Sequence, residues 1–164
     1  MNYVTHTILL VIINIFIISC SNNKLTVITI DNSSIEAVFP KKPIKESKNV
    51  LFGNVGNMKA SMASLEYKNI EYSVSYQVTE SDTFTYTKEG LYPAYLTRLG
   101  AKTYEKEYIT LNSIEGVQYK LHFNDRKAIV QMFADSNKTY NIFVIFPEKN
   151  LKDAEKFLKS IKIN

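Results

Sequence analysis

Apolar and polar residues alternate along several stretches of the chain, which is the pattern of strands that bury one face. The clearest stretch is IEYSVSYQV at 70–78, where apolar or aromatic side chains fall on one face and polar side chains on the other. VQYKLHF at 117–123 alternates in the same way. Shorter segments predict further strands: LTVITI at 25–30, IEAVF at 35–39, ASMASLEY at 60–67 and YITL at 108–111.

Two later segments, AIVQMFA at 128–134 and TYNIFVIF at 139–146, are apolar at nearly every position. Strands that are apolar on both faces are typical of the middle of a sheet with cover on both sides. Short turn sequences, NDRK and DSNK, separate these segments from each other and from 117–123. Turns this short connect antiparallel neighbours, so the pattern predicts an antiparallel meander.

Helical spacing occurs twice. In LYPAYLTRLG at 91–100 apolar residues recur every three or four positions, Pro93 suits a first turn and Gly100 a C-terminal stop. After Pro147, Asn150 has the position of an N-cap with Asp153 in the first turn. A stripe that would face the core follows: Leu151, Ala154, Phe157, Leu158 and Ile161. Strands, helix, meander and helix together predict an α+β fold, an antiparallel sheet with helices packed against it, in one domain over residues 25–164.

Residues 8–18, ILLVIINIFII, form an apolar run before the single cysteine, Cys20. The run is too short to span a bilayer but matches the hydrophobic region of a signal peptide. Ile17, Ile18, Ser19 and Cys20 resemble a bacterial lipobox. The resemblance implies that the Cys20 thiol receives diacylglycerol, that cleavage precedes Cys20, and that a fatty acid such as palmitate acylates the new amine. Residues 1–19 are then a lipoprotein signal peptide and residues 20–24 a lipidated tether.

One feature departs from this pattern, because MNYVTHT at the start contains no Lys or Arg. Either the true start lies upstream or the terminal amine supplies the positive charge. A buried or free thiol is the other interpretation of Cys20, but CSNNK is polar and has no strand or helix pattern that would bury it. Ser at position 21, where an Asp would signal retention in the inner membrane, favours the outer membrane facing the periplasm in a host with two membranes.

The net charge of the 164 residues is +4, with a pI of about 9.0. Positive and negative residues alternate, and no block of like charge occurs. A mildly basic surface is therefore favoured over a footprint for nucleic acid or anionic lipid, and no nucleic-acid partner is expected.

Residue types that carry catalysis or bind metal are sparse in the folded part. His122 is its only histidine, and it falls on the polar face of its strand beside Lys120. Without a second His or a Cys, neither a zinc site nor a Cys–His pair has its ligands or partners. Glu105 and Glu107 lie near lysines, which favours a solvated strand edge. We therefore expect no catalytic residues, no metal, no cofactor and no enzymatic activity.

Aromatic residues are the remaining candidates for recognition. Tyr72, Tyr76 and Tyr119 align with aliphatic residues of their strands, which favours the core. Four others lie in or near the segment 81–100 and are candidates for a surface that binds a glycan, peptide or lipid: Phe84, Tyr86, Tyr92 and Tyr95.

The order of these segments resembles that of bacterial envelope proteins with a PsbP-like domain. The resemblance covers about residues 35–164 and is carried by VFPKKP at 38–43, ITLNSIEGVQYKL at 109–121, AIVQMFADSNKTYNIFVIFP at 128–147 and AEKFLKSIKI at 154–163. It implies a twisted antiparallel β-sheet flanked by helices and a role in binding partners. The expected function is a membrane-anchored envelope lipoprotein that binds another protein or an assembly. The alternative is a carrier or sensor of a small lipid or glycan with a pocket near residues 84–99, and a hydrolase is the least favoured.

Overall fold

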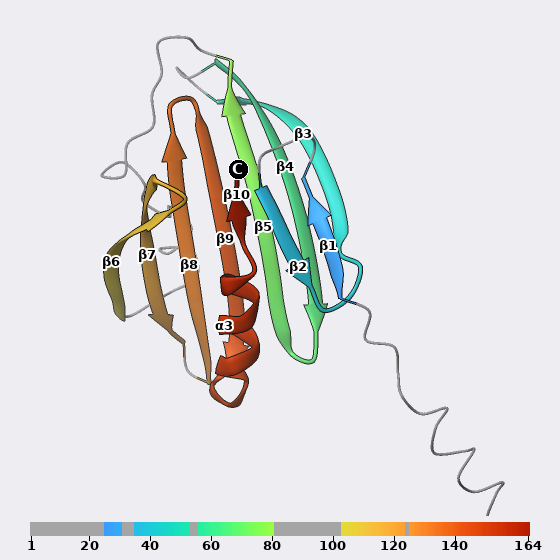
Figure 1. The fold of residues 1–164 in the computed structure, drawn as a ribbon, viewed down its shortest axis with the longest axis vertical. Coiled ribbons are helices and arrows are strands. Elements are labelled where there is room, and N and C mark those ends of the chain that lie inside the picture. Colours follow the sequence, from blue (N-terminus) through green and yellow to red (C-terminus); the bar gives the residue numbers. More distant parts are fainter. Residues whose placement is uncertain (1–24, 31–34, 53–55, 81–102, 124) are drawn as a thin grey trace, which may run out of the picture.

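A computed structural model of the chain describes residues 25–30, 35–52, 56–80, 103–123 and 125–164. These residues form two antiparallel sheets and a short helical segment (Figure 1). The strands are β1 (Thr26–Thr29), β2 (Ile35–Phe39), β3 (Ile44–Phe52), β4 (Gly56–Tyr67), β5 (Ile70–Thr79), β6 (Thr103–Leu111), β7 (Ile114–His122), β8 (Arg126–Asp135), β9 (Lys138–Pro147) and β10 (Lys162–Ile163). A 3-10 turn, η3 (Glu148–Asn150), leads directly into the helix α3 (Leu151–Lys159).

The large sheet has seven strands in the order β3-β4-β5-β9-β8-β7-β6. Two meanders, β3 to β5 and β6 to β9, meet where β5 pairs with β9. The two segments that are apolar on both faces therefore become β9, at the centre of the sheet, and its neighbour β8. Their predicted central position is confirmed.

The small sheet has the order β1-β2-β10 and lies with α3 over one face of the large sheet (Figure 1). Between the two layers is the main core, whose fully buried members include Ile35, Phe39, Val74, Ile142, Val144 and Ile163. Ala154 and Phe157 of α3 are buried in the same core. The small sheet and the helix therefore form one layer that covers the middle of the large sheet.

A second apolar cluster lies on the opposite face of β7 and β8. Its buried members are Val117, Tyr119, Leu121, Ala128, Val130 and Met132. β7 approaches β8 closely at Gly116, where a Cβ atom would lie 2.4 Å from the carbonyl oxygen of Met132 and 2.5 Å from the ring of Phe133. Only glycine fits that position without displacing its neighbours.

Tight turns join the strands of each meander. Lys68 and Asn69 between β4 and β5, and Asn112 and Ser113 between β6 and β7, all have positive φ. Two successive residues with positive φ are the requirement of a type I′ turn, whose twist matches that of a two-strand hairpin. The β4–β5 turn thereby points Lys68 outward at one end of the large sheet.

The structure corrects several details of the predicted elements. β3 and β10 were not predicted, and β7 begins at Ile114, three residues before the predicted strand at 117–123. Asn150 precedes α3 but makes no side-chain capping hydrogen bond, because the 3-10 turn η3 already leads the backbone into the helix. Leu151 is exposed, and Ile161 is buried beyond the end of α3.

The fold is mostly antiparallel β-sheet, with one short α-helix in the described part of the chain. The expected arrangement of a sheet clearly flanked by helices is therefore corrected to a sheet-dominated fold. The helix predicted at 91–100 lies outside the described residues.

Candidate functional site

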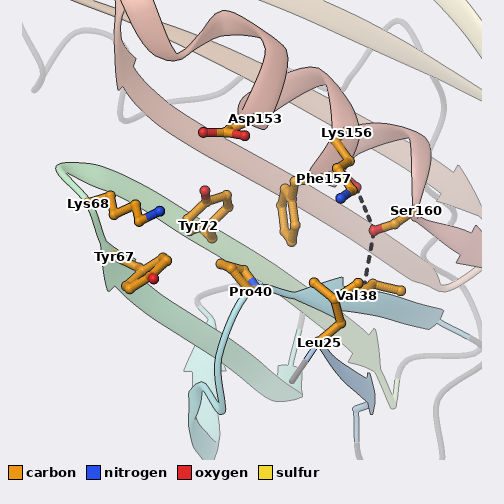
Figure 2. Close-up of a pocket in the computed structure, with 10 residues that line it drawn as sticks. All are labelled: Leu25, Val38, Pro40, Tyr67, Lys68, Tyr72, Asp153, Lys156, Phe157 and Ser160. Atoms are coloured by element: carbon orange, nitrogen blue, oxygen red, sulfur yellow. Dashed lines mark hydrogen bonds between the residues drawn. The ribbon is translucent and has the colours of Figure 1, made fainter. Parts of the chain in front are cut away.

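A pocket of about 500 Å³ opens at one end of the molecule, between α3, the small sheet and the β4–β5 hairpin (Figure 2). We call it the Tyr67 groove. It is lined by Leu25, Val38, Pro40, Tyr67, Lys68, Tyr72, Asp153, Lys156, Phe157 and Ser160. The volume falls within the range of pockets that bind small molecules or a few side chains of a partner.

The floor of the groove consists of aromatic side chains from two layers of the fold. Tyr72 of β5 and Phe157 of α3 meet edge to face, with ring centroids 4.9 Å apart. Phe157 makes a similar contact with Phe39 of β2, at 5.1 Å. Because Tyr72 and Phe157 are only 4% and 3% exposed, the floor is part of the core and is held in place by it.

Lysines stand around the aromatic floor. The Lys41 Nζ lies 4.6 Å from the centroid of the Tyr67 ring, and the Lys68 Nζ lies 5.3 Å from the same centroid. Both distances are within the range of a cation–π interaction. Lys156 lines the groove from α3. The groove therefore presents an apolar surface beside positive charge, which suits a ligand that combines an apolar group with a negative one.

Asp153 is the acidic residue of the lining. Figure 2 shows its carboxylate near the hydroxyl end of Tyr72. Burial raises the pKa of Tyr72 to about 12, and the negative charges of Asp153 and Tyr67 contribute to the increase. The Tyr72 hydroxyl therefore stays protonated at neutral pH, where it can donate a hydrogen bond.

Polar contacts made by Ser160 and by Arg126 hold the elements around the groove. The backbone N–H of Val38 donates to Ser160 Oγ (3.1 Å), and the Ser160 hydroxyl donates to the carbonyl of Phe157 (2.6 Å), which ties the end of α3 to β2. At the same end of the sheet, Arg126 pairs with Glu71 at 2.6 Å and donates to the carbonyl of Asn69 at 2.9 Å. The second contact holds the β4–β5 turn, and with it Lys68, against β8.

The described residues contain neither a cluster suited to a metal ion nor a helix suited to crossing a membrane. Among them, no group of three or more His, Cys, Asp or Glu side chains is placed to hold a metal ion. In the same residues, no helix is both long and apolar enough to cross a membrane.

The residues singled out from the sequence have different outcomes. Tyr72 and Tyr119 are buried and Tyr76 is partly buried, as their alignment predicted. His122 is exposed on β7, also as predicted. Five candidates lie outside the described residues: the lipidation site Cys20 and the aromatic residues Phe84, Tyr86, Tyr92 and Tyr95.

The groove itself was not predicted from the sequence. Tyr72 and Phe157 were assigned to the core, which is correct, but each also forms part of the groove floor. Tyr67 and Lys68, at the end of β4 and in the turn after it, are distant in sequence from Asp153 of α3. The one local signal was the PKKP segment at 40–43, in which Lys41 and Lys42 are exposed and Lys41 lies beside the aromatic ring of Tyr67.

Comparison with known proteins identifies the fold. The structure is similar to the solution structure of cyanobacterial PsbP (CyanoP) from Synechocystis sp. PCC 6803, with a TM-score of 0.53 and 12% sequence identity. The match covers 89% of this chain and 96% of CyanoP. No protein-family model matches the chain, and no curated protein matches it. The chain therefore has a PsbP-like fold, as its segment order suggested.

The raised pKa of Tyr72 makes a testable prediction about alkaline stability. Because the folded state holds this proton more tightly than the unfolded state, the stabilisation is complete below pH 10 and is lost between pH 10 and about 12. The loss amounts to about 2–3 kcal/mol. Urea unfolding of the full chain in nonionic detergent, at several pH values, should show a shallower alkaline decline for Tyr72→Phe than for the wild type. Equal declines would mean that Tyr72 ionises normally.

Proposed function

We propose that this chain is a membrane-anchored lipoprotein of the cell envelope, held by acyl chains on Cys20, and that its folded part is a non-enzymatic protein-binding or assembly module. The anchor is supported by the apolar run and the lipobox-like residues before Cys20. Two or more acyl chains hold a protein stably on a membrane, whereas one chain binds marginally. A thioether-linked diacylglycerol supplies two.

The observation that carries the binding role is the Tyr67 groove. Its floor is rigid because it belongs to the core, and its rim carries two lysines, Lys41 and Lys68, whose ammonium groups lie over the ring of Tyr67. Tyrosine is one of the residue types enriched at interface hot spots, which lie in well-packed pockets. The lining suits a partner segment with an acidic side chain next to an apolar or aromatic one.

A second candidate function, a carrier or sensor of a small amphiphilic ligand, is favoured by the groove's volume of about 500 Å³. Such a ligand would use the same lysines and aromatic floor. The mass of a crosslinked adduct distinguishes the two candidates, because a protein partner and a small ligand differ greatly in size.

We expect a photocrosslinking amino acid at Tyr67 of the full chain, in cells that make it, to give a discrete protein adduct. The same group at His122, which is exposed on β7, is the matched control and should give none. Lys68→Asn removes one ammonium while suiting the positive φ of that turn, and should reduce the adduct at Tyr67 substantially. An adduct of small mass would favour the second candidate.

Two outcomes would contradict a groove-based binding role. One is equal crosslinking from Tyr67 and His122. The other is loss of the cellular activity in a stably folded His122→Ala protein, which would require a catalytic role for that histidine. For comparison, loss of a hot-spot contact of about 2 kcal/mol weakens binding about 30-fold.

A further inference from the structure

We infer that the end of the domain that carries the Tyr67 groove rests on the phospholipid surface of the anchoring membrane, with a preference for anionic lipid. We call it the groove end; it comprises the start of β1, the end of β2 with residues 40–42, the β4–β5 turn and the start of α3. The inference rests on the proposed lipid anchor at Cys20. Three observations carry it: where exposed apolar side chains gather, where lysines gather, and where the tether enters.

Exposed apolar side chains are concentrated at this end. In the described part of the chain five large hydrophobic residues are exposed: Leu25, Val27, Ile44, Tyr108 and Leu151. Leu25 and Val27 lie on β1 or just before it, Ile44 begins β3 and Leu151 begins α3. The starts of these three elements lie at or near the groove end (Figure 1). Three of the five exposed apolar residues, Leu25, Val27 and Leu151, therefore belong to the groove end, and Ile44 lies beside it.

The outer face of the small sheet is apolar only at its groove end. Val27 is 64% exposed and pairs with Val38, and Leu25, 51% exposed, lines the groove with Val38 and Pro40. The next pair on the same face, two residues along β1, is Thr29 opposite Glu36. Lys162 of β10 also pairs with Glu36. The face thus changes from apolar to polar within a few residues, as expected of a surface whose near end touches lipid.

Lysines flank the same apolar residues. Lys41 and Lys42 are exposed after β2, Lys68 is exposed on the β4–β5 turn, and Lys156 lines the groove from α3. The carboxylate in the groove lining is Asp153. Arg126 and Lys127, also at this end, are paired with Glu71 and Glu148. The fold therefore gathers at one end lysines that are scattered along the sequence, and lysines near a membrane surface are attracted to anionic lipid.

The tether brings this end to the membrane. Leu25 is five positions after Cys20 in the sequence, and an extended chain spans at most about 3.6 Å per position. Leu25 therefore lies within about 18 Å of the acylated residue, whatever conformation the tether takes. The β8–β9 turn lies at the other end of the large sheet (Figure 1). With the groove end on lipid, the groove would recognise its partner at the membrane surface.

The test measures the depth of two labelled positions in the full chain, reconstituted in vesicles of phosphatidylcholine with one quarter phosphatidylglycerol. Val27→Cys and Asp135→Cys, the latter exposed at the end of β8, each add one free thiol, because an acylated Cys20 does not react with a thiol-directed fluorophore. Lipids with a nitroxide on the upper acyl chain quench a fluorophore that contacts the bilayer. We expect quenching at Val27 to exceed that at Asp135 several-fold.

Charge reversal tests the role of the lysines. The docked fraction is read from the quenching at Val27. In the Val27→Cys protein, Lys41→Glu together with Lys42→Glu should lower this fraction about five-fold or more in mixed vesicles. Vesicles of pure phosphatidylcholine should also lower it for the protein that keeps both lysines. Vesicle-bound protein with equal quenching at Val27 and Asp135 would overturn the inference while leaving the anchored binding module intact. An unacylated Cys20, seen in the intact mass, would instead remove the anchor on which both proposals rest.

Discussion

Phe157→Ala is expected to reduce the free energy of unfolding by about 3–5 kcal/mol, a large share of the 5–15 kcal/mol typical of a domain. Phe157 is 3% exposed and contacts Phe39 of the small sheet and Tyr72 of the large sheet through its ring edges. Its removal leaves a cavity where α3, the small sheet and the large sheet meet, and also opens the floor of the Tyr67 groove. Urea unfolding of the full chain in nonionic detergent measures the change.

The matched control is Leu151→Ala in the same helix. Leu151 is 36% exposed, so its truncation should cost much less than that of Phe157. If Phe157→Ala unfolds at the same urea concentration as the wild type, α3 does not stabilise the sheet in the way the contacts indicate. The rigidity of the groove floor would then have to come from contacts other than those of Phe157.

The centre of the sheet was predictable because the sequences of its strands are compatible with few other positions in a fold. The segments 128–134 and 139–146 are apolar on both faces, and only a central position covers both. The alternation at 70–78 likewise fixed which face of β5 is buried, and Ile70, Tyr72 and Val74 are indeed in the core. In these strands the hydrophobic pattern and the tertiary environment agree.

The strands that were missed carry little hydrophobic signal. β3 has the sequence IKESKNVLF, and residues 44–49 of it are exposed, because it is an edge strand whose pairing with β4 is made by the backbone. Charged residues along such an edge discourage pairing with another molecule. β10 is only two residues long and exists because Ile163 pairs with Ile35. Neither the backbone pairing of an exposed edge strand nor a two-residue pairing produces a periodic pattern in the sequence.

The groove could not be predicted because no segment contains it. Its floor comes from β5 and α3, its lysines from the β4–β5 turn, α3 and the residues after β2, and its edge from Leu25. In the sequence these lysines alternate with acidic residues, which favoured a uniformly basic surface over a lipid footprint. Lys68 follows Tyr67 directly in the sequence, but only the fold brings the distant Lys41 to the same ring.

Acylation of Cys20 is the claim on which the functional account depends most directly, because the anchor decides where the groove meets its ligand. Cys20→Ala should remove all fatty-acid labelling and leave residues 1–19 attached, since in the proposed lipoprotein the thiol is both the acceptor of diacylglycerol and the mark for cleavage. Stability should be unchanged, because Cys20 precedes the first strand, which begins at Thr26.

The measurement is metabolic labelling of the full chain with a palmitate analogue, together with the intact mass of the purified protein. The account predicts a wild-type protein that begins at an acylated Cys20 and a Cys20→Ala protein that is unlabelled and uncleaved. A Cys20→Ala protein that is still cut after Ser19 and still labelled with fatty acid would contradict it.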